Sequence, residues 1–164
     1  MRAIAALLLY LLCHAATAAE FRPFTATSKA AIERAQAGRP FVLAFWSLDC
    51  SYCAEELQQL RRLRAAYPSL ALVLVSTDSA EVSGEAHAML DRLLEGTRAE
   101  RWMFSGSDAE HLYFAVDRRW HGELPRAYFY DGAGKAQTVA GKAQPQWLAA
   151  WARACAAAPA CTSP

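Results

Sequence analysis

The sequence has no internal repeat, no low-complexity tract and no linker rich in proline, glycine or serine. Without such a boundary, the chain of 164 residues is expected to fold as one domain. It also has almost no net charge, because 17 lysines and arginines face 16 aspartates and glutamates, which gives a formal charge of +1. A chain so close to neutrality carries no electrostatic footprint for a phosphate backbone, which argues against nucleic-acid binding. Hydrophobic residues at 54% and charged residues at 20% argue against disorder.

Several catalytic signatures are absent as well. The sequence contains no pattern typical of a serine–histidine–aspartate triad, a phosphate-binding loop or a peroxiredoxin. His87, His111 and His121 are scattered, which is more typical of surface or capping positions than of metal ligands. Of the five cysteines, the four beyond residue 19 are therefore the residues best suited to chemistry.

The first 19 residues are typical of a secretory signal peptide. Arg2 supplies a positive charge, an apolar run follows from Ala3 to Leu12, and small residues fill positions 15–19. The apolar run is shorter than the roughly 20 residues that a membrane-spanning helix needs, although an uncleaved N-terminal anchor is the alternative. We expect the leader to be cleaved and residues 20–164 to form the mature domain. The expected location is a bacterial periplasm, where disulfides persist.

Hydrophobic patterning predicts strands alternating with helices. Continuous apolar runs at 41–46 and 70–75 are typical of strands buried on both faces. Two further strands are expected at 127–130 and 136–140, joined as a hairpin by a glycine-containing turn. Helices are expected over 27–36, from Cys53 to just before Pro68, over 85–94, from a capping box at 107–110 through 116, and from Pro145 onward. The predicted fold class is α/β, with a central sheet covered by helices on both faces.

Cys50 and Cys53 form a CxxC pair where the strand over 41–46 leads into a helix. Thiolate is the reactive form of cysteine, and the amides and dipole of a helix N-terminus stabilise its negative charge. Cys50 is nearer the helix start, so we expect it to attack. Cys53, on the apolar side of the helix, is expected to resolve the mixed disulfide. A zinc site would need a second close cysteine pair, and a purely structural disulfide is the other alternative.

The residues around and beyond this pair resemble the thioredoxin superfamily. The resemblance rests on Phe45-Trp46, the CxxC pair, Glu56 and the later Gly122-Glu123-Leu124-Pro125. It is nearest to the exported TlpA/ResA-type thiol–disulfide oxidoreductases and extends from about residue 41 to residue 141. It implies a thioredoxin-like fold with a mixed central sheet, thiol–disulfide exchange as the activity, and no cofactor.

The resemblance also implies roles for individual residues. Pro125 is expected to follow a cis peptide bond and to face the cysteine pair, with an ordinary proline at a strand start as the alternative. Glu56 is expected to handle the proton of Cys53, although a solvated helix glutamate fits its position equally well. Tyr52 and Leu124 are expected to contact the substrate, and no resident metal is implied.

The sequence departs from the family pattern close to the cysteine pair. Asp49 and Tyr52 replace the usual tryptophan and proline before the two cysteines, and Ala44 replaces the buried acid of cytosolic thioredoxins. Asp49 would oppose thiolate formation at Cys50 unless it caps the helix. The TlpA/ResA resemblance favours a reductase, whereas the Ser51-Tyr52 pair resembles exported disulfide isomerases. An oxidase or isomerase is therefore the alternative.

Cys155 and Cys161 flank Pro159, which ends the last helix and lets the chain fold back. In an oxidising compartment we expect a structural disulfide between them. The loop-entropy model gives such a short ring a stabilisation of about 2.4 kcal/mol. A second redox pair and two free thiols are the alternatives.

The implied partners are exported proteins with disulfides and an upstream thiol electron donor, either membrane-bound or soluble. A monomer is expected, with no nucleic-acid partner. The alternative from another class is a Cu(I) chaperone that binds with Cys50, Cys53 and His121, because thiolates suit Cu(I). Copper chaperones of this superfamily typically separate their cysteines by three residues, and this sequence does not.

Overall fold

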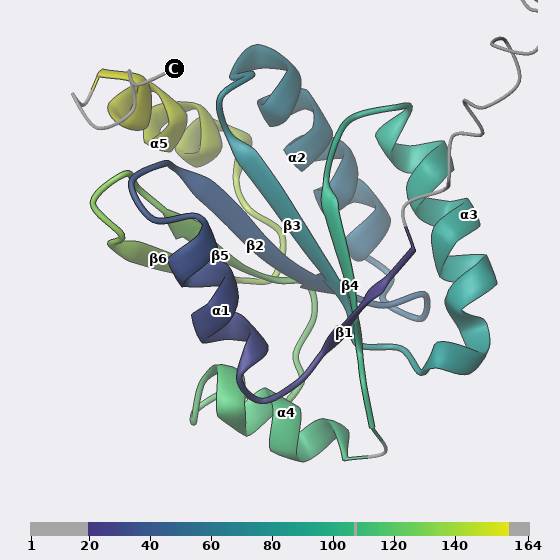
Figure 1. The fold of residues 1–164 in the computed structure, drawn as a ribbon. Helices are drawn as coiled ribbons and strands as arrows, with labels where there is room; N and C mark the ends of the chain where they lie inside the picture. The colour runs from purple at the N-terminus through teal and green to yellow at the C-terminus, as the bar shows by residue number, and fades with distance from the viewer. Residues whose placement is uncertain (1–19, 107, 158–164) are drawn as a thin grey trace, which may run out of the picture.

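A six-stranded mixed sheet lies between two layers of helices in the computed structural model, which describes residues 20–106 and 108–157 (Figure 1). The strands are β1 (Arg22–Phe24), β2 (Phe41–Trp46), β3 (Ala71–Ser76), β4 (Glu100–Phe104), β5 (Arg126–Tyr130) and β6 (Ala136–Ala140). The helices are α1 (Ser28–Ala35), α2 (Cys53–Ala66), α3 (Ser83–Leu94), α4 (Ala109–Val116) and α5 (Pro145–Ala157), with a 3-10 turn η1 (Ala80–Val82) before α3. The predicted α/β class, with helices on both faces of a mixed sheet, is confirmed.

The strand order β1-β4-β3-β2-β5-β6 gives β2 a central position. The strands β1, β4, β3 and β2 are parallel to one another, whereas β5 is antiparallel to β2 and to β6. All six residues of β2 are buried, which explains why this segment reads as an unbroken apolar run. The loop after β2 therefore begins at the end of a central strand, between the ends of its neighbours β3 and β5.

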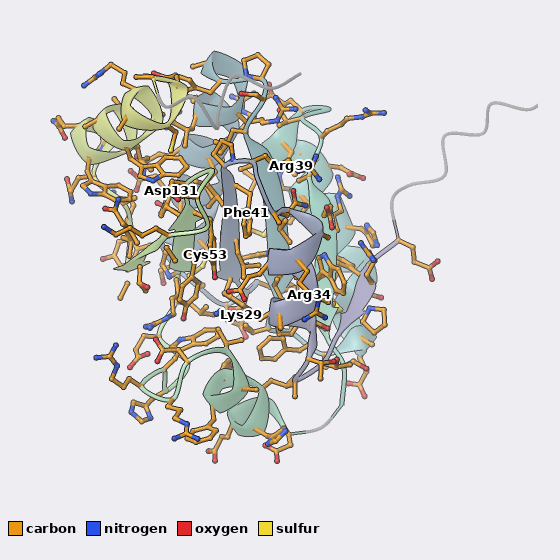
Figure 2. All side chains as sticks on the ribbon, turned by 60° about the vertical axis from the view of Figure 1, so that its left-hand side comes forward. Lys29, Arg34, Arg39, Phe41, Cys53 and Asp131 are labelled. Atoms are coloured by element: carbon orange, nitrogen blue, oxygen red, sulfur yellow. A yellow bond between two sulfur atoms is a disulfide. The ribbon has the colours of Figure 1, made fainter. Side chains whose placement is uncertain are left out.

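The two faces of the sheet carry separate hydrophobic cores. Successive side chains of a strand point to opposite faces, so Val42, Ala44 and Trp46 pack with α2, α3 and α5 on what we call the α2 face. Leu43 and Phe45 pack with α1 and α4 on the opposite α1 face. Side chains fill the space on both sides of the sheet (Figure 2).

Two strands were not predicted. The three-residue strand β1 is an edge strand with Pro23 at its centre, too short to produce a periodic pattern. The strand β4 begins with Glu100 and Arg101, which do not resemble an apolar run. Their charges are satisfied only in the folded chain, where Glu100 pairs with Arg22 and Arg101 pairs with Asp91.

The helix α4 begins differently from the prediction. Asp108 is its N-cap residue, and the Asp108 Oδ1 atom accepts the amide of His111 at 2.9 Å. The expected capping box placed Ser107 in this role, but Ser107 lies outside the described residues. Aspartate caps as well as serine does, so the prediction was one residue out of register.

Some predictions concern parts of the chain that the structure does not describe. The expected leader over residues 1–19 and Cys161 both lie outside the described residues, so signal cleavage and the Cys155–Cys161 pairing remain predictions. Cys155 itself lies on α5 and is buried. In the described part of the chain, no helix combines the length and apolar character needed to span a membrane.

Candidate active site

The Cys50–Cys53 pair lies at the connection from β2 to α2. The two cysteines form a disulfide, with their Cα atoms 5.3 Å apart. Cys53 is the first residue of α2 and is fully buried, whereas Cys50 precedes the helix and is only partly buried. Cys50 is therefore the more accessible sulfur, as the sequence predicted.

The loop that carries Cys50 is tied to the neighbouring strand. The carboxylate of Asp78, just beyond β3, accepts the amide of Leu48 at 3.1 Å through Oδ2 and at 3.3 Å through Oδ1. The Ser76 hydroxyl donates to Asp78 Oδ2 at 2.6 Å. The amide of Cys53 donates to the carbonyl oxygen of Cys50 at 3.1 Å, which forms the tight turn into α2. The sequence analysis missed Asp78, although its place after a buried parallel strand puts it at the same sheet edge as Cys50.

The start of α2 differs from one sequence-based expectation. The N-cap residue is Tyr52, and it makes no side-chain capping bond, so Asp49 does not cap the helix. The Tyr52 side chain is 63% exposed, which is unusual for a large aromatic residue. An exposed ring between the two cysteines is available to a partner.

Pro125 lies at the end of β2 that leads to the cysteines. The Leu124–Pro125 peptide bond is cis. Phe45 pairs with Arg126 in the β2–β5 ladder, so Pro125 lies next to the last residues of β2. The carbonyl oxygen of Pro125 accepts the amide of Gly141 at 2.8 Å, which fixes it to the segment after β6.

Leu124 lies between the two cores of the sheet. It is partly buried and packs against both the α2 face and the α1 face. Cys50 packs against the same α2-face core. Leu124 and Pro125 are therefore brought to the edge of the sheet where the disulfide lies.

Glu56 is buried rather than solvated. Its residue is 2% exposed, and it follows Cys53 by three positions on α2, so the two side chains share one side of the helix. The Glu56 Oε2 atom accepts the amide of Ala143 at 3.0 Å, whereas Oε1 has no hydrogen-bond partner among the described residues. The interpretation of Glu56 as a solvated helix glutamate is wrong.

The surroundings of Glu56 change its acidity. Burial raises the pKa of Glu56 from 4.5 to about 7, against the opposing effects of the Ala143 amide and the Lys142 cation. The nearby Glu55 carboxylate adds to the increase. A carboxyl group with such a pKa can both accept and donate a proton near neutral pH.

The structure adds no support for a metal-binding role. Within residues 20–106 and 108–157, no three or more His, Cys, Asp and Glu side chains group together in a way that could hold a metal ion. His121 is exposed, and its amide donates to the Glu123 Oε2 atom at 3.2 Å.

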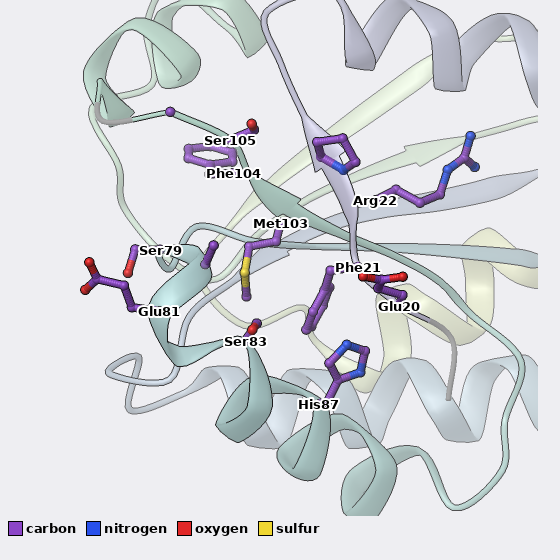
Figure 3. A pocket seen from close by; sticks show the side chains of 13 residues that line it. Glu20, Phe21, Arg22, Ser79, Glu81, Ser83, His87, Met103, Phe104 and Ser105 are labelled. Atoms are coloured by element: carbon purple, nitrogen blue, oxygen red, sulfur yellow. The ribbon is translucent and has the colours of Figure 1, made fainter. Parts of the chain in front are cut away.

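A separate cavity of about 500 Å³ lies beside β1 and α3 (Figure 3). Phe21, His87 and Met103 line it, and the rings of Phe21 and His87 are 4.2 Å apart. Neither cysteine and none of the predicted substrate contacts borders this cavity. This cavity is therefore separate from the candidate active site.

Comparisons with known proteins identify the fold. No family model matches the chain, and no curated protein matches its sequence. A secreted disulfide oxidoreductase of Mycobacterium tuberculosis, homologous to E. coli DsbE, aligns with 74% of this chain and 85% of its own at 19% identity and a TM-score of 0.57. A thiol-disulfide isomerase from Corynebacterium glutamicum aligns with 76% and 85% at 12% identity and a TM-score of 0.61.

A third solved structure carries the superfamily name. A thiol:disulfide interchange protein of the thioredoxin family from Chlorobium tepidum aligns with 75% of this chain and 83% of its own at 9% identity and a TM-score of 0.56. Identities this low establish the fold alone. The chain has a thioredoxin-like fold, as the sequence predicted.

Proposed function

We propose that the protein is a thiol–disulfide oxidoreductase that reduces disulfides in exported proteins. The observation that carries the proposal is the Cys50–Cys53 disulfide at the N-terminus of α2, with one sulfur accessible and the other buried. The cis Leu124–Pro125 segment at the same sheet edge supports it. The thioredoxin-like fold is the third support.

The proposed reaction begins from the reduced dithiol. The Cys50 thiolate attacks a substrate disulfide, so a Cys50–substrate S–S bond forms, the substrate S–S bond breaks, and one substrate thiolate leaves. The Cys53 thiolate then attacks the Cys50 sulfur, which releases the second substrate thiolate and forms the Cys50–Cys53 disulfide. Two electrons pass to the substrate, and its two thiolates take up protons. An upstream dithiol donor restores the reduced pair by the same exchange in reverse.

Glu56 is proposed to take the proton of Cys53 during the second exchange. Cys53 is fully buried, so its thiol needs an acceptor inside the protein before it can attack. Glu56 lies one helical turn away with one carboxylate oxygen without a partner in the described part of the chain. Its pKa of about 7 suits proton transfer in both directions near neutral pH.

Tyr52, Leu124 and Pro125 are proposed to contact the substrate. The Tyr52 ring is exposed between the two cysteines, and Leu124 and Pro125 lie at the end of β2 that leads to the cysteines. Together they would form an apolar border around the accessible Cys50 sulfur. Such a surface suits a segment of polypeptide better than a small charged molecule.

The periplasmic location and the direction of electron flow are parts of this proposal. The leader-like residues 1–19 support export, and the Mycobacterium tuberculosis protein of similar fold is described as secreted. The TlpA/ResA-like motifs support a reductase, and the proposed acting form is a monomer. Disulfide isomerisation is the second candidate, favoured by Tyr52 in the CxxC pair and by the isomerase from Corynebacterium glutamicum.

The reduction potential separates these directions. We expect the purified protein to reduce insulin with a dithiol donor and to equilibrate with glutathione toward the thioredoxin end of the superfamily range, which extends from about −270 to −120 mV. Cys50→Ser should abolish insulin reduction, and Cys53→Ala should accumulate mixed disulfides through Cys50. A potential near the oxidising end would contradict the reductase direction. Failure of both thiols to react with an alkylating reagent in the reduced, folded protein would overturn the exchange activity itself.

We also propose a structural disulfide between Cys155 and Cys161. Cys155 is buried on α5, and Pro159 would end that helix before Cys161. The mass of the intact protein after alkylation without reductant tests this pairing. Two labelled thiols at these positions would contradict it.

A further inference from the structure

A second group of polar residues lies on the α1 face, directly beside Pro125. The segment 117–125, which we call the cis-proline loop, runs from the end of α4 to the start of β5. Its two flanks are joined by an ion pair, because the Arg126 Nη2 atom donates to the Asp117 Oδ2 atom at 2.6 Å. The loop is therefore closed at its base by a charge pair.

The Arg126 guanidinium group donates hydrogen bonds from two of its nitrogen atoms to two different residues. Its side chain is 10% exposed, and its Nε atom donates to the Tyr128 hydroxyl at 2.8 Å while Nη2 reaches Asp117. The guanidinium carbon also lies 5.6 Å from the ring centroid of Trp120 and 5.4 Å from that of Tyr128. A planar fork can make these contacts at once, whereas a lysine ammonium acts as a single point charge.

Asp117 joins this pair to the helix before it. It is the C-cap residue of α4, and its amide donates to the Tyr113 carbonyl oxygen at 3.0 Å. The Asp117 Oδ1 atom accepts the amide of Arg119 at 3.0 Å, so its two carboxylate oxygens have different partners. Movement of Arg126 would therefore be transmitted to the end of α4 and to the first residues of the loop.

The interior of the loop is equally constrained. Trp120 is 2% exposed, and its indole Nε1 atom donates to the Glu123 carbonyl oxygen at 3.0 Å, immediately before Leu124. Gly122 has a φ of 98°, and a Cβ atom placed there would lie 2.9 Å from the Tyr113 ring. The backbone that leads to Leu124 and Pro125 is thus held from both ends and from within.

We propose that Arg126 is a positioning residue that fixes Leu124 and Pro125 against the substrate. The inference rests on the proposed function. Arg126 directly follows Pro125 and is paired with Phe45 of β2, while its side chain holds the cis-proline loop on the α1 face. The buried Cys53 and Glu56 lie on the α2 face. Loosening Arg126 should therefore impair the binding of a polypeptide and leave the reactivity of the sulfur pair intact.

The test compares a protein disulfide with a small one. Arg126→Lys and, as an independent arm, Asp117→Asn are assayed for KM and kcat in insulin reduction, and for the rate with hydroxyethyl disulfide. The expected result is a KM for insulin raised about tenfold, because small displacements of positioning groups have large effects. The kcat for insulin and the rate with hydroxyethyl disulfide should stay within about twofold of the unaltered protein.

A matched control exists on β4. Arg101 also has a mostly buried side chain, at 11% exposure, and its Nη2 atom lies 2.7 Å from the Asp91 Oδ1 atom. This ion pair joins β4 to α3 and does not involve the cis-proline loop. Arg101→Lys perturbs a comparable ion pair and should leave the KM for insulin unchanged. An equal increase of KM in the Arg101 variant would show that general loosening of the fold, not loop position, is responsible.

Other results of these assays would overturn or support the positioning role of Arg126. An unchanged KM for insulin in both Arg126→Lys and Asp117→Asn would overturn the positioning role, as would an equal loss of rate with both disulfides. A protein that reduces neither substrate before any substitution would overturn the proposed function, and with it this inference. Restoration of the insulin KM by small-molecule guanidine in an Arg126→Ala variant would support the role directly.

Discussion

Two carboxyl groups near the candidate site lie on opposite faces of the sheet and in opposite electrostatic surroundings. Glu56, on the α2 face, is 2% exposed and receives one hydrogen bond, from the Ala143 amide. Asp117, on the α1 face, has partners on both oxygens, and one of them is the Arg126 guanidinium. Burial without a directly bonded cation raises the pKa of Glu56 to about 7.

The surroundings of Asp117 act in the other direction. The amide of Arg119, followed by the guanidinium of Arg126, lowers the pKa of Asp117 below its usual value against the opposing effect of burial. The contrast shows how one small domain can hold a carboxyl group that changes its proton near neutral pH beside one that stays ionised. The first suits proton transfer, and the second suits fixed structure.

Removing Asp117 should have the largest effect on stability. Asp117→Leu leaves the Arg126 cation buried without its partner, and we expect a loss of about 3 kcal/mol in the free energy of unfolding. Denaturant unfolding measures it. The control, Glu55→Leu, removes a carboxylate that is 54% exposed from a lysine that is 32% exposed, so no buried cation is left without a partner, and it should cost less than about 1 kcal/mol. Equal losses in the two variants would remove the distinction between the ion pairs.

Replacing Glu56 should change how stability depends on pH. The pKa of Glu56 is about 7 in the folded protein and takes the ordinary value of 4.5 in the unfolded chain. Between pH 4.5 and pH 7 the folded state therefore binds more protons than the unfolded state. Stability from this group is therefore present below pH 4.5 and is lost as the pH rises through 7. At about 1.4 kcal/mol per unit the loss is about 3 kcal/mol.

Unfolding free energies measured from pH 4 to pH 8 test this slope. Glu56→Gln should remove that part of the decline, whereas Glu55→Gln, whose carboxylate is 54% exposed, should leave most of it. The contribution of Asp117 to stability should change with pH in the opposite direction. Its pKa is lowered in the folded protein, so the stability that it provides is lost as the pH falls below its ordinary pKa. The same slope in Glu56→Gln and in the unaltered protein would contradict the assigned pKa.

Gly122→Ala should have a smaller effect, confined to the cis-proline loop. The substitution strains a backbone with a φ of 98° and places a methyl group 2.9 Å from the Tyr113 ring, so we expect a loss of about 1–3 kcal/mol. Gly134→Ala is the matched control, since Gly134 has a φ of 80° and nothing within 4 Å of the added atom. The difference between the two melting temperatures isolates the contact with Tyr113. No difference would mean that the ring moves away freely.

The smallest expected effect concerns Lys142. Its ammonium group pairs with Glu55 at 2.7 Å, and its positive charge also lowers the pKa of Glu56. Lys142→Met should raise the pKa of Glu56 further while changing stability at neutral pH by less than about 1 kcal/mol. Carboxyl chemical shifts followed by NMR through a pH titration measure it. Lys29→Met, on the α1 face, should leave the Glu56 titration where it is.

The sequence predicted the parts of the fold that depend on local pattern. The central strands β2 and β3 are buried on both faces, so their composition alone distinguishes them. The strand β4 escaped prediction because Glu100 and Arg101 find their partners on β1 and α3, far away in the sequence. Such compensation cannot be read from neighbouring residues.

The same division applies to the candidate site. Cys50 and Cys53 were predicted because their spacing is local, and Glu56 because its position matches an acidic residue of the TlpA/ResA-type proteins that the sequence resembles. Asp78 and the Asp117–Arg126 pair were missed, since their contacts join residues brought together only by the sheet. One signal was present for Arg126, a single charge at the start of the otherwise apolar strand β5.

The short strand β1 has a consequence for how the molecule behaves among copies of itself. The open side of an outer strand is a template on which another chain can add, and long flat edges promote aggregation. Here the outer strand next to β4 is β1, which is only three residues long. Its central residue is Pro23, which has no amide hydrogen to donate to another chain. Self-association along this side of the sheet is thereby discouraged by the covalent structure of one residue.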